Sequence, residues 1–68
     1  MTDLQALRDE IKAERPYVGR KEFSHNIIGS LLAQIAQEHG KAEANRAIRE
    51  LGLKRLGWNE EPEEAPNA

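Results

Sequence analysis

Apolar residues recur at helical spacing along most of this chain, and three helix-breaking residues divide that pattern into separate segments. Pro16 ends the first segment, because the residue before a proline is pushed out of the α region. Gly40 and Gly52 follow the second and third segments, where a glycine can end a helix at little conformational cost. These breaks predict an all-α domain of three short helices.

The first helix is expected over residues 3–14. Either Thr2 or Asp3 can cap its N-terminus, since both side chains can accept a hydrogen bond from a free backbone N–H. Its apolar positions fall on one face at helical spacing. They are Leu4, Leu7 and Ile11.

The second helix, over residues 21–39, is the expected core helix because its large apolar residues form one broad stripe. Those residues are Phe23, Ile27, Ile28, Leu31, Leu32 and Ile35. The start of this helix has an alternative. Ser24 can itself act as the N-cap, with Phe23 and Ile28 then placed for a hydrophobic staple.

The third helix is expected over residues 41–51, where the apolar spacing resumes at Ala44, Ala47, Ile48 and Leu51. Only Gly40 separates it from the second helix, so the two must form a tight corner or hairpin packed through their apolar stripes. Residues 53–58 continue the apolar spacing. This predicts a short helical turn that folds Trp58 back onto the core.

Residues 1–58 are expected to form one helical domain, followed by a disordered acidic tail at residues 59–68. The tail has no apolar side chain larger than alanine, so nothing offsets the entropy cost of ordering it. The net charge of -2 hides a segregation, because residues 15–58 hold eight basic and four acidic side chains. A basic body beside an acidic tail could bind an anion with which the tail competes, or could simply be solvated charge.

Composition excludes several classes of protein. The chain has no cysteine, which removes disulfides, thiolate nucleophiles and cysteine-bound zinc. A reducing, cytoplasmic location fits that composition, and residues 1–10 do not resemble a secretory signal or a transit peptide. No stretch approaches the roughly 18 apolar residues of a membrane span, so no membrane association is expected.

No catalytic or cofactor-binding pattern is present. The serine, threonine and histidine side chains lack any motif that would activate a nucleophile, so we expect no enzyme activity, no cofactor and no small-molecule substrate. Glu22 and His25 have the Glu-x-x-His spacing of metal sites in helical bundles. Such a site needs further carboxylates, and only Glu14 or Glu38 could supply them. Two exposed residues near a helix start explain the pair without a metal, so no metal site is expected.

Protein interaction explains the most features of the sequence. Gly29, Ala33 and Ala36 form a face of small residues on the second helix, along which another helix could approach closely. Self-association would add stability to a fold whose small apolar core supplies little folding free energy. Tyr17, on a turn beside Arg20, is the best candidate for an aromatic contact. The sequence therefore predicts an adaptor or inhibitor module, expected to form a homo-oligomer through its central helix.

DNA binding is the alternative hypothesis. Residues 34–52 resemble a helix-turn-helix motif in outline, with Ala36 four residues before the turn glycine, although Arg46 stands where the motif has a buried aliphatic residue. The helix of residues 41–51 would then present side chains that can read bases or bind phosphates. The candidate nucleic-acid or anion contacts are Arg20, Lys21, Lys41, Asn45, Arg46 and Arg49.

The size, the hairpin and the acidic tail together resemble, in general outline, the small helical-bundle regulators of plasmids and phages. No motif of this chain matches such a regulator residue by residue. No functional residue is assigned from the resemblance, and two hypotheses stand: a protein-interaction module and a DNA-binding regulator.

Overall fold

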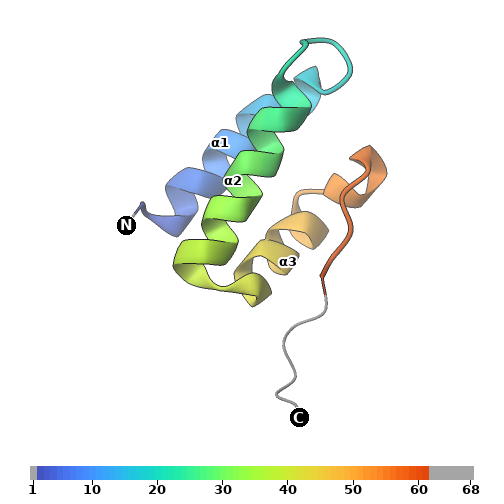
Figure 1. The fold of residues 1–68 in the computed structure, drawn as a ribbon. Coiled ribbons are helices and arrows are strands. Elements are labelled where there is room, and N and C mark those ends of the chain that lie inside the picture. The colour runs from blue at the N-terminus through green and yellow to red at the C-terminus, as the bar shows by residue number, and fades with distance from the viewer. Residues whose placement is uncertain (1, 62–68) are drawn as a thin grey trace.

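The computed structural model describes residues 2–61 of the chain. It contains three α-helices, α1 (Leu4–Glu14), α2 (Ser24–His39) and α3 (Lys41–Glu50), and this part of the chain contains no β-strand. A 3-10 turn, η1 (Arg15–Tyr17), follows α1, and a second one, η2 (Leu53–Leu56), follows α3. The all-α class predicted from the helix-breaking residues is confirmed, and so is the order of three helices and a final turn (Figure 1).

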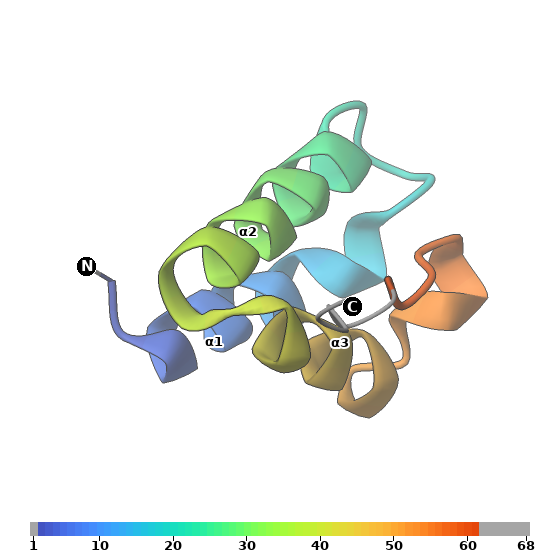
Figure 2. The ribbon, with the colours of Figure 1, turned by 60° about the horizontal axis from the view of Figure 1, so that its bottom comes forward.

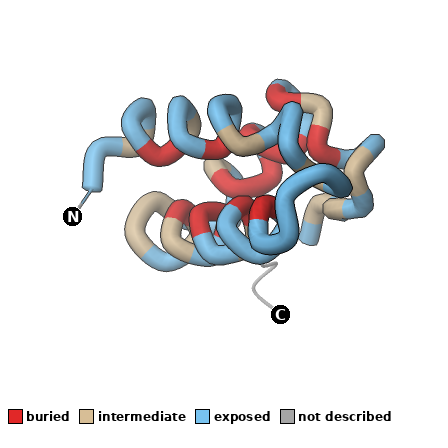
Figure 3. Tube along the Cα trace, turned by 90° about the horizontal axis from the view of Figure 1, so that it is seen from above, coloured by how far each residue is buried: buried red, intermediate tan, exposed pale blue. Residues whose placement is uncertain are grey.

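The three helices enclose a single core. α1 and α2 run antiparallel side by side, and the chain turns sharply at Gly40 so that α3 packs on the same side of α2 as α1 does (Figure 2). The buried residues of all three helices lie on the sides of the helices that face one another (Figure 3). The buried apolar residues of the helices are Leu7, Ile11, Ile28, Leu31, Leu32, Ile35, Ala44, Ala47 and Ile48, and the segment after α3 adds Leu51 and Leu53.

Polar contacts fix the ends of the helices. Asp3, one of the two predicted caps, accepts a hydrogen bond from the backbone N–H of Ala6 at 3.2 Å. The backbone N–H of Thr2 instead donates to Glu38 at 2.8 Å, which ties the start of the chain to the end of α2. Arg15 donates to the backbone carbonyl of Leu51, so the turn after α1 caps the end of α3. The contacts of Thr2 and Arg15 join segments that lie far apart in the sequence.

The predicted start of the second helix at residue 21 is three residues too early. The backbone N–H groups of Arg20 and Lys21 both donate to the carbonyl of Tyr17, so the chain stays in a turn through that point. α2 begins at Ser24 and its N-cap position is Phe23, so the alternative in which Ser24 is the N-cap is also wrong. Ser24 is fully buried and makes no capping hydrogen bond. Its hydroxyl donates to Glu14 at 3.0 Å and links α1 to α2.

The apolar stripe of α2 is wider than the surface that its neighbours cover. Phe23 is 61% exposed and Ile27 is 41% exposed, so both lie outside the core in which the sequence pattern placed them. Phe23 precedes the first turn of α2, and Ile27 lies at the edge of the contact with α1. α1 and α3 are packed against the centre of the stripe and leave this edge open.

The last described residues fold back over α3, as the red end of the ribbon shows in Figure 1. η2 brings Trp58 against the core, where it is half-buried, which confirms the prediction for residues 53–58. The position of the chain is also fixed beyond Trp58, because Asn45 binds the backbone of Glu61. The remainder of the predicted tail, residues 62–68, lies outside the described residues. None of the helices in residues 2–61 combines the length and the apolar character needed to cross a membrane.

Candidate functional site

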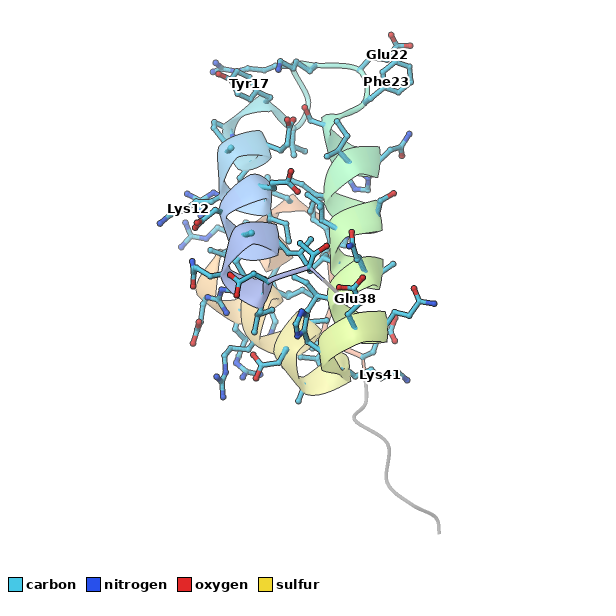
Figure 4. The ribbon with its side chains drawn as sticks, turned by 90° about the vertical axis from the view of Figure 1, so that its left-hand side faces the viewer. Lys12, Tyr17, Glu22, Phe23, Glu38 and Lys41 are labelled. Atoms are coloured by element: carbon cyan, nitrogen blue, oxygen red, sulfur yellow. The ribbon has the colours of Figure 1, made fainter. Side chains whose placement is uncertain are left out.

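An apolar surface lies along one edge of α2. Ile27 and Leu31 of α2 face Ala13 of α1 across a shallow groove whose rim carries Glu10 and other polar side chains. Phe23 lies next to Ile27 by one helical turn and projects from the end of the molecule (Figure 4). We call Phe23, Ile27 and this groove the bare flank, because no part of residues 2–61 covers them.

The predicted face of small residues lies along the opposite edge of α2, and much of it is already occupied. A Cβ atom added at Gly29 would lie 4.0 Å from Nε1 of Trp58, so the indole packs over this glycine. Ala36 is half-buried against the core, and Ala33 is exposed. The indole also stacks on the ring of His25, with centroids 4.2 Å apart and an interplanar angle of 19°. We call this edge the covered flank.

Tyr17 lies at the same end of the molecule as Phe23 (Figure 4) and is 42% exposed. The ammonium group of Lys21 lies 4.2 Å from the centroid of the Tyr17 ring, a cation–π contact. Arg20 and Lys21 are both exposed. The predicted contact residues of this turn are therefore accessible, although one face of the tyrosine ring is taken by its own neighbour.

Asn45 does not lie on the outward face of α3, where the DNA-binding hypothesis placed it. Asn45 is only 3% exposed, because its side chain lies in the groove between α2 and α3. Its Nδ2 donates to the carbonyl oxygen of Glu61 at 2.7 Å, and its Oδ1 accepts from the backbone N–H of Glu61 at 2.9 Å. The donor and the acceptor that would read an adenine edge are thus both used within the chain.

The basic side chains of α3 are exposed, and each of the predicted ones has a carboxylate partner. Arg49 lies 2.8 Å from Glu60, and Lys54 of η2 lies 2.8 Å from the other oxygen of that carboxylate. The remaining pairs are longer, at 3.8 Å: Lys41 with Glu61, and Arg46 with Glu43. Residues 60 and 61 therefore sit on the surface that the anion-binding hypothesis requires.

Three carboxyl groups have a pKa below their ordinary value because each accepts hydrogen bonds from other parts of the chain. Hydrogen bonds from Lys54 and then Arg49 lower the pKa of Glu60. Arg8, at 2.6 Å, lowers the pKa of Glu50 in the same way and joins α1 to α3. The backbone of Thr2 and the side chain of Gln34 lower the pKa of Glu38. All three groups are anchors of the fold rather than candidate proton donors.

The Glu-x-x-His pair, Glu22 and His25, is not joined, in the described part of the chain, by the further carboxylates that a metal site would need. His25 stacks on Trp58, Glu14 accepts from Ser24, and Glu38 lies near the far end of α2. Within residues 2–61 no group of three potential ligands comes together.

Comparison of the chain with protein-family models, with curated proteins and with solved structures finds no match. The assignment of a function therefore depends on the two flanks of α2 and on the face of α3.

Sequence reasoning missed two features of these surfaces and anticipated a third in part. The exposure of Phe23 and Ile27 left no mark in the helical spacing, which reports only that a residue is apolar. The ion pair between Lys54 and Glu60 was indicated in general terms by the charge segregation, since a basic body can pair with an acidic tail. No signal in the sequence pointed to Asn45 as a buried backbone-binding residue.

Proposed function

We propose that this chain is a small, non-catalytic protein-interaction module that self-associates through α2. The observation that carries the proposal is the bare flank, where two large apolar side chains, Phe23 and Ile27, stand beside an apolar groove. Single exposed apolar residues are common, but a clustered patch next to a groove is typical of an interface.

A second copy is the partner that this flank fits. Two α1–α2 hairpins packed through their bare flanks would form a four-helix arrangement, a common solution for small helical proteins. Both copies would bury Phe23 and Ile27, and Ala13 on α1 would allow close approach. The added apolar burial would strengthen a fold whose own core is small.

Sedimentation equilibrium of the purified chain tests this proposal. We expect a dimer whose helicity falls on dilution, and a folded monomer for Ile27→Lys, in which the new ammonium group lies near Glu10 and Glu14 of the same groove. Ala33→Lys is the matched control, since Ala33 is exposed on the other edge of α2. If Ala33→Lys dissociates the dimer and Ile27→Lys does not, the face of small residues is the interface. A monomer at every concentration would reject self-association.

The second candidate function is DNA binding by α3, and the exposed cluster of Lys41, Arg46 and Arg49 supports it. The buried Asn45 and the carboxylate partner of each of those three cations weigh against it. A DNA-binding regulator should lose affinity steeply with added salt and on Arg46→Ala. If duplex binding is weak and independent of that arginine, this candidate is eliminated.

A further inference from the structure

Asn45 makes an unusual contact for a side chain in the middle of a helix. Its amide group binds both the N–H and the C=O of one residue, Glu61, and so holds a stretch of backbone without regard to the side chain attached to it. A nearly buried asparagine must satisfy both its oxygen and its nitrogen. Here an extended segment of chain supplies the partners for both atoms.

The surroundings of Asn45 form a groove suited to such a segment. Small side chains of α2, Ala33 and Ala36, line one wall together with Gly29, and Ile48 lies on the wall formed by α3. Three cations surround the bound segment and contact its acidic side chains. They are Lys41, Arg49 and Lys54.

We propose that the groove between α2 and α3 is a binding site for an extended acidic peptide of a partner protein, and that residues 59–61 occupy it as an intramolecular competitor. Two kinds of side chain on α3 and η2 divide the recognition. Asn45 holds the peptide backbone, and the cations select glutamate or aspartate beside it. This surface is separate from the bare flank, so the proposal goes beyond self-association.

A peptide fits this site better than a nucleic acid does. The hydrogen bonds of Asn45 are directed at a peptide N–H and C=O lying 2.9 and 2.7 Å away at the bottom of the groove. A phosphate backbone has no N–H group to offer its amide oxygen. The cations alone would accept either polyanion, so the contacts of Asn45 decide between them.

The intramolecular segment is held weakly enough to be displaced. Its ion pairs are solvent-exposed, and exposed pairs contribute little and weaken with salt. Its advantage is that it is tethered, which gives it a high effective concentration at the groove. A free peptide therefore binds with an apparent affinity reduced by the small fraction of molecules in which the groove is open.

Fluorescence anisotropy with a labelled peptide that copies residues 57–64 tests the proposal. The double variant Glu60→Gln/Glu61→Gln weakens the intramolecular segment, while the peptide keeps its glutamates. We expect this full-length variant to bind the peptide about tenfold more tightly than the parent chain, since three ion pairs no longer compete. A peptide with glutamine in place of every glutamate should lose that gain.

Two arginines provide a matched pair in the background of the double variant. Arg49→Gln removes a cation that contacts the segment, and we expect peptide affinity to fall about threefold. Arg46→Gln removes an equally exposed cation that pairs with Glu43 instead, and affinity should not change. Circular dichroism checks that both variants remain helical.

Three results would overturn the proposal. One is a double variant that binds the peptide no more tightly than the parent chain. Another is equal loss of affinity on Arg46→Gln and Arg49→Gln, which would show unspecific attraction. The third is a gain in affinity for a single-stranded oligonucleotide of matched charge without a gain for the peptide. Ile27→Lys should leave peptide binding unchanged, so failure here is distinguishable from failure of the self-association proposal.

Discussion

The two flanks of α2 differ in burial, and the difference is the opposite of what the size of their apolar side chains would suggest. The flank with the larger side chains, Phe23 and Ile27, is exposed, whereas Gly29 on the opposite flank is covered by Trp58. The covering residues come from the part of the chain that follows η2 and returns across α3. Which flank of α2 is buried therefore depends on the path of the chain after η2. A small residue at Gly29 allows that segment to lie close to α2.

The largest expected effect separates the two aromatic residues that border α2. Trp58→Ala should lower the free energy of unfolding by about 2 kcal/mol, because it removes a half-buried ring that packs on the core and stacks on His25. Phe23→Ala should change the stability of the monomer by less than about 0.5 kcal/mol, because its ring is largely exposed. Urea denaturation at low protein concentration measures both values.

An equal loss of unfolding free energy from Trp58→Ala and Phe23→Ala would contradict the difference between the two flanks. They would mean that Phe23 is covered in solution, and repetition at high concentration would show whether a second copy covers it. A loss confined to Trp58→Ala would establish that only one flank belongs to the monomer's fold.

The next effect comes from Gly29, where the size of the added side chain decides its sign. A single Cβ fits, since its nearest neighbour would be 4.0 Å away, so Gly29→Ala should stabilise the helix by about 0.5–1 kcal/mol. Gly29→Leu should push the indole of Trp58 away and cost about 1–2 kcal/mol. Ala33→Leu, one turn along, is the control and should be nearly neutral. Thermal unfolding of the three variants measures the order, and a neutral Gly29→Leu would show that Trp58 does not rest on Gly29.

The smallest effect concerns acid. The pKa of Glu60 is held below its ordinary value of 4.5 by Lys54 and Arg49, so the pairing stabilises the fold above that value and is lost as the pH falls through the lowered pKa. Glu60→Gln should therefore lower the urea midpoint at pH 6, and this difference should shrink steadily as the pH falls below 4.5. Contributions of Glu38 and Glu50 are common to both proteins and cancel in the difference. A difference that does not shrink with falling pH would mean that Glu60 acts through packing instead of charge.

The helices were predictable because their signals are local. Pro16 and Gly40 break the pattern within a few residues of the true helix ends, and Asp3 caps α1 through a contact only three residues away. The error at the start of α2 has the same origin. The turn at Tyr17 is held by backbone hydrogen bonds that no side-chain pattern records.

The candidate sites were less predictable because their contacts span the chain. Asn45 looked like an exposed polar residue of an amphipathic helix, and only the return of Glu61 sixteen residues later explains its burial. The spacing of Gly29 and Ala36 predicted a face that another helix could approach, but it could not show that Trp58 of the same chain lies over Gly29. Helical periodicity identifies the faces of a helix and leaves their neighbours unspecified.

The position of residues 58–61 after all three helices has a consequence for the order of folding. The three helices follow one another along the chain, and their buried core includes none of residues 58–61. α1, α2 and α3 can thus assemble around their core before Trp58 and Glu61 dock, since local contacts close fastest. Until that docking the groove is open, and a partner peptide that meets it encounters no competitor.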